Sequence, residues 1–159
     1  MAEFTSKRSV RVLSELSAAL WLVNTKAIKH IDYSLIDGSR TTNQQVARYA
    51  QGRTAPGRIV TFVDGINDLS RHQVTPEDPL THAFDFIPAP FTYWEDQPVF
   101  TAYAHFIIGI GYEHGIELRW GGDWDQDFRW RDQKFNDYPH IEEVIQSKFT
   151  LNDSGKVPV

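Results

Sequence analysis

The first apolar pattern along the chain has a helical period, carried by Val10, Val12, Leu13, Leu16, Ala19, Leu20 and Val23. It predicts a helix over residues 10–23. A second helix is predicted over residues 42–51, because Thr42 and Gln45 have the spacing of a capping box and Gly52 suits the C-terminal stop. Residues 97–114 predict a long central helix that ends at Gly115.

Short runs of β-forming residues lie between these helices. Strands are predicted over residues 33–36, 59–63, 83–87 and 116–120, each followed by glycine or proline. Helices and strands are mixed without a regular βαβ rhythm, so the expected class is α+β. We expect one small domain over residues 1–159, with a core at about 10–143 and a tail at about 150–159 that has little to bury.

Composition narrows the class of protein. The chain has 159 residues, 41% of them hydrophobic, which is enough for one globular core. Its net charge of −5 argues against a nucleic-acid partner, which would favour a basic face. The chain has no cysteine, so any bound metal must be held by nitrogen and oxygen atoms.

Nothing in the sequence indicates export or membrane insertion. Residues 1–11 are polar and lack the apolar stretch of a secretory signal. The longest apolar-rich stretch, residues 99–112, contains His105 and is too short to span a bilayer. We therefore expect synthesis in the cytoplasm, with another protein opening the way to any substrate outside the membrane.

Four residues carry the candidate chemistry: His72, Asp85, Asp137 and His140. Two imidazoles and a carboxylate can hold a catalytic zinc ion, and a second carboxylate can serve as a nearby base. Each residue also has an ordinary interpretation. Asp85 suits the solvent face of an amphipathic strand, and residues 137–140 suit a polar loop whose Asp and His bond to each other. The combination, rather than any single residue, favours the zinc site.

Two further features bear on this site. Pro139 disfavours helix at Tyr138, so residues 137–140 should follow a fixed extended or turn path. Arg40 follows the turn at residues 37–39 and is either a solvated turn residue or a positive charge in the cleft. In a peptidase such a charge stabilises the oxyanion formed during attack. Nothing local decides between these interpretations of Arg40.

Taken together, these motifs resemble the LAS group of zinc peptidases, which includes D-Ala-D-Ala carboxypeptidases and dipeptidases. The group's pattern is Ser-x-His-x-x-Gly-x-Ala-x-Asp, followed later by an acidic residue three positions before a histidine. Ser70 and His72 match its first half, and Ala83 and Asp85 match its second. Residues 137–142, Asp-Tyr-Pro-His-Ile-Glu, resemble the Asp-x-Pro-His-Phe-Glu stretch of the bacteriophage endolysins in this group.

Other segments resemble the same phage branch, the L-alanyl-D-glutamate endopeptidases. Residues 38–41 (Gly-Ser-Arg-Thr), 51–57 (Gln-Gly-Arg-Thr-Ala-Pro-Gly) and 120–124 (Trp-Gly-Gly-Asp-Trp) resemble its motifs in order. The resemblance covers about residues 10–143. It implies a short antiparallel sheet flanked by helices, with a zinc cleft.

The resemblance also implies roles for individual residues. His72, Asp85 and His140 would bind Zn²⁺, Asp137 would be the general base, and Arg40 would stabilise the oxyanion. The substrate would be the peptidoglycan stem peptide, cut between L-alanine and D-glutamate by a monomeric enzyme that causes host lysis. The enzyme would stay in the host cytoplasm until a holin releases it to the periplasm and cell wall.

One departure from the pattern leaves alternatives open. Twelve residues, 73–84, separate His72 from Asp85, more than the family pattern has, and Thr81 stands at the expected glycine. This insertion predicts an acidic, proline-stiffened loop that shapes substrate access or lets His82 replace His72 as a ligand. Alternative functions are a D-Ala-D-Ala carboxypeptidase or dipeptidase, a non-catalytic wall-binding or phage structural protein, and a zinc-stabilised domain without turnover.

Overall fold

The computed structural model describes residues 3–129 and 131–144, so the predicted tail at about 150–159 lies outside the described residues. Its elements are α1 (Lys7–Glu15), α2 (Ala18–Ala27), β1 (Tyr33–Asp37), α3 (Thr42–Ala50), β2 (Ala83–Pro88), α4 (Gln97–Glu113), β3 (Leu118–Trp120) and β4 (His140–Glu143). The strands form an antiparallel sheet in the order β1-β2-β4-β3. The predicted α+β class is confirmed.

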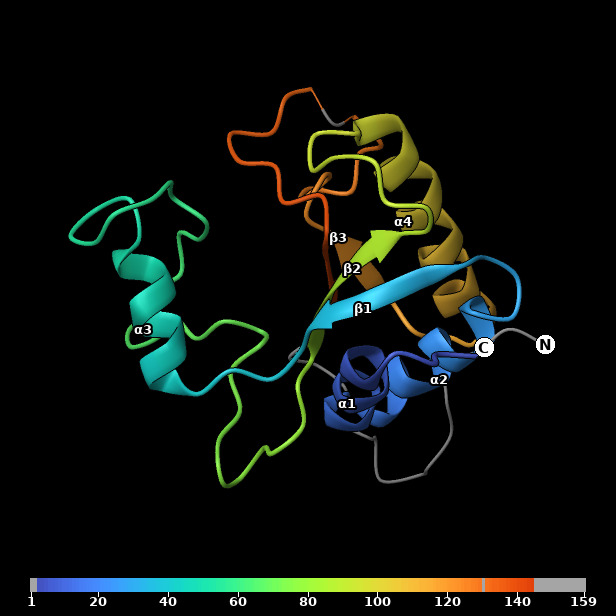
Figure 1. Ribbon diagram of the computed structural model, residues 1–159, viewed down its shortest axis with the longest axis horizontal. Helices are drawn as coiled ribbons and strands as arrows, with labels where there is room; N and C mark the ends of the chain where they lie inside the picture. The colour runs from blue at the N-terminus through green and yellow to red at the C-terminus, as the bar shows by residue number, and fades with distance from the viewer. Residues whose placement is uncertain (1–2, 130, 145–159) are drawn as a thin grey trace, which may run out of the picture.

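The hydrophobic core lies between the sheet and three helices. In Figure 1, α1, α2 and α4 gather beside the sheet, whereas α3 and the loops around it stand apart. Phe84 and Phe86 of β2 and Ile141 of β4 are fully buried in this core. Because side chains alternate along a strand, Asp85 and His140 point to the other face of the sheet. The apolar pattern of β2 thus determines where its one carboxylate goes.

We call α3 and the loops around it the α3 lobe. Arg40 and Gln45 join this lobe to the sheet. A parallel bridge pairs Arg40 with Gln73, in which the Arg40 amide donates to His72 O at 2.8 Å. Gln45 is fully buried; its side chain accepts from Arg40 at 3.2 Å and donates to Val63 O at 2.9 Å. A cavity of about 830 Å³ lies between this lobe and the face of β2 and β4 that carries Asp85 and His140.

The predicted helix over residues 10–23 is wrong, because the chain forms two helices there. Leu16 is extended, with φ −75° and ψ 150°, and pairs with Thr81. The Ser17 hydroxyl then accepts from the Leu20 amide and caps α2. The helical period continues across the break because both helices bury one side. A tertiary contact with the 73–84 insertion therefore interrupts a pattern that is locally continuous.

Three smaller predictions also need correction. The capping box of α3 uses Thr41 and Gln44, one residue earlier than predicted, which frees Gln45 for its buried bonds. Residues 59–63 form no strand; their side chains line the cavity instead. The strand predicted from residue 116 begins at Leu118, because the Ile116 amide still bonds to Gly111 O at the end of α4.

Candidate metal centre and its surroundings

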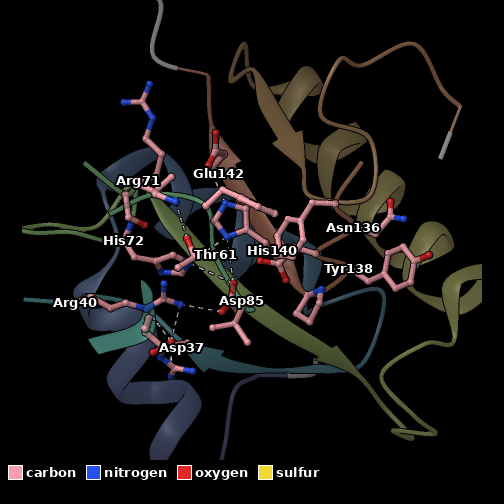
Figure 2. A pocket seen from close by; sticks show the side chains of 18 of the residues that line it. Asp37, Arg40, Thr61, Arg71, His72, Asp85, Asn136, Tyr138, His140 and Glu142 are labelled. Atoms are coloured by element: carbon pink, nitrogen blue, oxygen red, sulfur yellow. Dashed lines mark hydrogen bonds and ion pairs between the residues drawn. The ribbon is translucent and has the colours of Figure 1, made fainter. Parts of the chain in front are cut away.

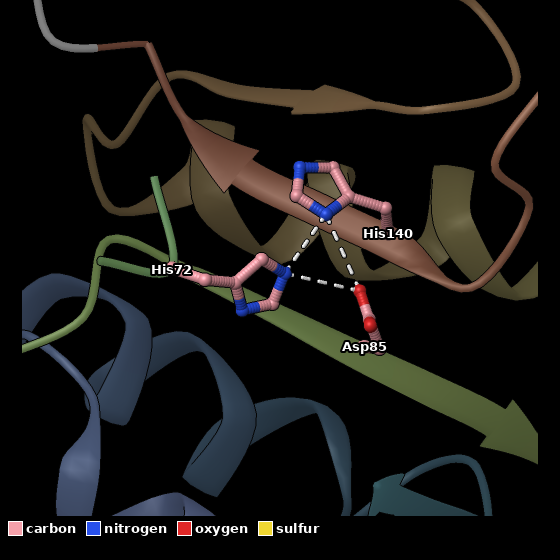
Figure 3. Close-up of side chains that lie close together, drawn as sticks. All are labelled: His72, Asp85 and His140. Carbon is pink, nitrogen blue, oxygen red and sulfur yellow. Dashed lines mark hydrogen bonds and ion pairs between the residues drawn. The ribbon is translucent and has the colours of Figure 1, made fainter. Parts of the chain in front are cut away.

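Strand pairing brings two of the predicted ligands together. Asp85 and His140 are direct partners in the antiparallel register of β2 and β4, so their side chains lie side by side on one face. His72 reaches them from the loop that the Arg40–Gln73 bridge holds against the sheet. His72 Nε2 lies 3.1 Å from His140 Nδ1, and each nitrogen lies 3.2 Å from Asp85 Oδ1 (Figure 3).

The outer nitrogen of each imidazole has an acceptor that determines which nitrogen carries the proton. His72 Nδ1 is 2.6 Å from Gly38 O, and a carbonyl oxygen only accepts, so Nδ1 carries the proton. His140 Nε2 donates to the Glu142 carboxylate at 2.8 Å. The lone pairs of His72 Nε2 and His140 Nδ1 are therefore both directed to the space beside Asp85, as metal ligation requires.

The geometry of these three atoms fits a small divalent cation. Donor atoms about 2.0–2.1 Å from one tetrahedral zinc ion lie about 3.3 Å from each other. The observed separations of 3.1–3.2 Å are close to that value. Nitrogen and carboxylate oxygen are also donors that zinc accepts. His72, Asp85 and His140 are thus able to hold zinc without a large movement of the chain.

Charged neighbours hold the Asp85 carboxylate in place. Arg40 Nη2 lies 3.3 Å from Asp85 Oδ2 and 2.8 Å from Asp37 Oδ2, and its side chain is only 13% exposed (Figure 2). Burial raises the pKa of Asp85, but the two imidazoles outweigh this and keep the pKa well below its usual value. Asp85 is therefore ionised and ready to ligate. Arg40 lies in the site as predicted, and its role in stabilising an oxyanion stays a prediction.

Without a metal, a proton takes the place of the cation at His140. Burial alone lowers the pKa of His140, but the hydrogen bonds to Asp85 and Glu142 raise it to about 10. Burial lowers the pKa of His72, in spite of the opposing effect of Asp85. The protein thus keeps one positive charge at this centre at neutral pH. Metal binding must displace that proton, so the apparent metal affinity should rise with pH.

Asp137 lies beside this group, at the wall of the same cavity. Its amide donates to Gly121 O at 2.7 Å, and its carbonyl accepts from the His140 amide at 3.1 Å. A side chain on Gly121 would overlap the Asp137 carbonyl, which explains a glycine in the Trp-Gly-Gly-Asp-Trp segment. Burial, and next the charge of Asp85, raise the pKa of Asp137 to about 6. Such a carboxylate is suited to accept a proton near neutral pH.

His82 does not join the metal group. Its two ring nitrogens face Asp78 at 2.9 Å and Glu143 at 3.3 Å, and Glu143 also bonds to the Ser17 hydroxyl. Among the described residues that line the cavity, none comes from residues 73–84. Gln73 and Val74 pair with Arg40, whereas Thr81 and His82 bond near the junction of α1 and α2 and to Glu143. In the structure, then, the His82 ring is bonded away from the three candidate ligands, and the effect of the loop on substrate access stays a prediction.

We expect zinc content to separate the two histidines. His72→Ala should lose most of the bound zinc, because it removes one of three converging donors. His82→Ala should bind zinc as the parent protein does, since its contacts are with Asp78 and Glu143. Metal analysis of both purified variants after dialysis tests this. Zinc loss in His82→Ala alone would show that His82 is the ligand in solution.

The structure places further residues beside the predicted ligands. Glu142 is 6% exposed and bonds to His140 on one side and to Arg119 on the other, with Arg119 Nε 3.1 Å from its Oε1. Trp124 lies against both, its ring 5.5 Å from the His140 ring. The i, i+2 spacing of His140 and Glu142 in a strand could have identified this pair. Arg119 and Trp124 become evident only from the pairing of β3 with β4.

Comparison with known proteins identifies the family of the chain. Residues 1–144 match the model of the phage L-alanyl-D-glutamate peptidase family. The peptidoglycan L-alanyl-D-glutamate endopeptidase CwlK of Bacillus subtilis (strain 168) is 30% identical over 118 residues, which are 74% of this chain and 64% of CwlK. This chain thus spans less than two thirds of that relative.

A solved structure supports the fold. The crystal structure of the Serratia marcescens L-Ala D-Glu endopeptidase ChiX superposes with a TM-score of 0.59 and 22% identity, over 88% of this chain and 89% of ChiX. At that identity the likeness concerns the arrangement of helices and strands. The family match, which extends from the first residue through β4, includes every candidate ligand. The chain therefore belongs to the phage L-alanyl-D-glutamate peptidase family.

Proposed function

We propose that this protein is a zinc-dependent endopeptidase that hydrolyses the L-alanyl-D-glutamate bond of peptidoglycan stem peptides. One observation carries the proposal: His72, Asp85 and His140 direct three donor atoms to one point, in a cavity that Asp137 also lines. This is the minimum set for metal-assisted hydrolysis, and it occurs in a member of a family with that activity.

The residues around this point have separate tasks. Zinc held by His72, Asp85 and His140 would supply a Lewis acid that acidifies water and polarises the scissile carbonyl. Asp137 takes a proton from the attacking water, whose oxygen forms a bond to the alanyl carbonyl carbon. Asp137 then gives the proton to the amide nitrogen as the C–N bond breaks. The second proton of the water also passes to the leaving nitrogen, so the products are an alanyl carboxylate and the ammonium group of the glutamyl residue.

Two neighbours prepare these groups for the reaction. Glu142 accepts the Nε2 proton of His140 and so keeps Nδ1 free for the metal. Arg40 bonds to Asp37 and Asp85 and keeps the Asp85 carboxylate oriented. We further propose that an arginine proton not used in these bonds stabilises the oxyanion. The side chains of Arg40 and Glu142 are both largely buried, which is consistent with their proposed roles as orienting groups.

The decisive experiment identifies the bond that is cut. Purified peptidoglycan is digested with and without a zinc chelator, and the released fragments are analysed by mass spectrometry. We expect chelator-sensitive release of stem peptides that begin at D-glutamate, with L-alanine left on the glycan. Release of D-alanine or D-alanyl-D-alanine would instead identify a carboxypeptidase or dipeptidase. No product from folded, zinc-loaded protein would favour a binding or structural role.

The proposed place of action is outside the inner membrane. No helix within the described residues is long and apolar enough to cross a bilayer. We propose that the enzyme remains in the host cytoplasm until a holin opens the membrane, and that it acts on the wall as a monomer. Expression in a bacterial host with and without a holin gene tests this, because lysis without holin would contradict it.

A further inference from the structure

The proposed substrate carries a negative charge, on the glutamyl residue, for which the proposed metal site has no binding group. The glutamyl residue on the leaving side has two carboxyl groups, and only one of them continues the peptide. The other is a free carboxylate close to the amine that leaves. This inference rests on the proposed function. Because Asp137 delivers the proton to that amine, the enzyme needs a positive group on the Asp137 side of the cavity.

Three of the six arginines that line the cavity in the described structure are paired with Asp37, Asp85 or Glu142. Arg40 bonds to Asp37 and Asp85, and Arg119 bonds to Glu142. Arg48 lies 3.5 Å from Asp37. Turning Arg40 or Arg119 to the substrate carboxylate would break its bond to Asp85 or to Glu142, the partner of His140. Arg48 shares its partner Asp37 with Arg40. Another arginine is therefore the better candidate to bind the free carboxylate of the glutamyl residue.

Arg58 has the properties required. It lines the cavity together with Asp137, and its segment lies beside the Asp137 segment, because Phe62 packs edge-on against Phe135 with 5.1 Å between the ring centroids. Its acidic partner is Glu95, at 3.5 Å, with exposed fractions of 74% and 69% for the two side chains. Such an exposed pair contributes little free energy and is readily exchanged. Arg58 can thus leave Glu95 without cost to the metal site.

The remaining arginines of the cavity lie less favourably. Arg71 directly precedes His72, but its guanidinium points away from the His72, Asp85 and His140 group in Figure 2. Arg8 belongs to α1, which packs on β1, and β2 separates β1 from β4.

We propose that Arg58 binds the free carboxylate of the glutamyl residue, and that Glu95 occupies Arg58 when substrate is absent. The neighbours of both residues, Ile59 and Trp94, are also part of the cavity lining, so the pair borders the cavity that is proposed to hold the substrate. Bound substrate would cover Arg58 and exclude water, which strengthens the new ion pair relative to the exposed one. Glu95 is then a competitor that makes entry selective for an acidic residue.

Two synthetic stem peptides test the proposal. They are identical except that one carries a carboxamide in place of the free carboxylate of the glutamyl residue. We expect the parent enzyme to prefer the acid by kcat/KM. Arg58→Gln should lose about tenfold on the acid and little on the amide, because one charge-assisted contact is removed. Arg58→Lys should keep part of the preference, and Glu95→Gln should raise kcat/KM on the acid alone, mainly through KM.

A matched control uses the same substitution in a comparable pair. Arg129 and Asp127 form an exposed pair at 3.8 Å that does not line the cavity, so Arg129→Gln should change the cleavage of neither substrate. Equal losses on both peptides in Arg58→Gln, or no preference in the parent enzyme, would overturn the role of Arg58. A Glu95→Gln variant with the same kcat/KM on the acid peptide as the parent would overturn the proposal that Glu95 competes with substrate for Arg58. If the parent cleaves neither peptide, the proposed function itself fails, which is a distinct result.

Discussion

Replacing His140 with alanine is expected to remove bound metal and peptidase activity together. His140 Nδ1 is one of three converging donor atoms, and its loss leaves only His72 and Asp85. Changing a residue that merely orients a metal ligand lowers metal affinity about 10- to 100-fold, so removal of a ligand should exceed about 100-fold. Zinc titration with a competing chelator, together with peptidoglycan digestion, measures both effects.

Stability provides a second readout of the same variant. Metal that binds only the folded chain raises its melting temperature, so chelator should lower the melting temperature of the parent protein. It should leave that of His140→Ala unchanged. His114 is the matched control, because it is exposed and, within the described residues, its ring bonds to its own helix through Ile110 O at 2.9 Å. A His140→Ala protein that retains zinc and activity would exclude His140 as a ligand.

The convergence of His72, Asp85 and His140 was expected from the sequence because these residues carry unusual chemistry at recognisable positions, and metal binding by them stays a prediction. Asp85 stands in a run of apolar residues where an unpaired carboxylate would be costly. The period of that run also gave β2 correctly and placed Asp85 opposite Phe84 and Phe86. The face of the sheet on which a strand residue lies can be predicted locally, since the alternation of side chains is a property of the strand backbone.

The pairings between distant segments of the chain could not be predicted from the sequence. The partnership of Asp85 with His140 depends on the register of β2 and β4, and His72 depends on the bridge between Arg40 and Gln73. The break between α1 and α2 likewise follows from the pairing of Leu16 with Thr81. None of these pairings has a local signal, because each is decided by tertiary packing.

The second large effect is expected for Asp137→Asn, which should abolish turnover but keep the metal. Asparagine has nearly the shape of aspartate but cannot accept a proton from water. Loss of a general base typically lowers kcat by about 100- to 10,000-fold. Zinc content and KM should change little, because Asp137 is not one of the three donors. Equal zinc loss in Asp137→Asn and His140→Ala would contradict the assignment of Asp137 as the base.

The pH dependence of the parent enzyme belongs to the same prediction. The pKa of Asp137 is raised to about 6 by burial and then by Asp85, and a bound cation would lower it again. Only the ionised carboxylate can act as base, so kcat/KM should fall with decreasing pH at or below about 6. A profile that stays flat well below that pH would exclude Asp137 as the group that titrates.

Stability decides whether an inactive Asp137→Asn is merely misfolded. In the metal-free protein the pKa of Asp137 is about 6, above its unfolded value of about 3.9. A carboxyl whose pKa is raised by folding makes its full contribution to the free energy of unfolding below the unfolded pKa. This contribution is lost as pH rises through the folded pKa of about 6. Asparagine never ionises and avoids that loss. In chelator, Asp137→Asn should therefore match the parent near about pH 4 and unfold at higher denaturant concentration near about pH 7. A variant less stable than the parent at neutral pH would mean that the substitution damages the fold, and its inactivity would then say nothing about the base.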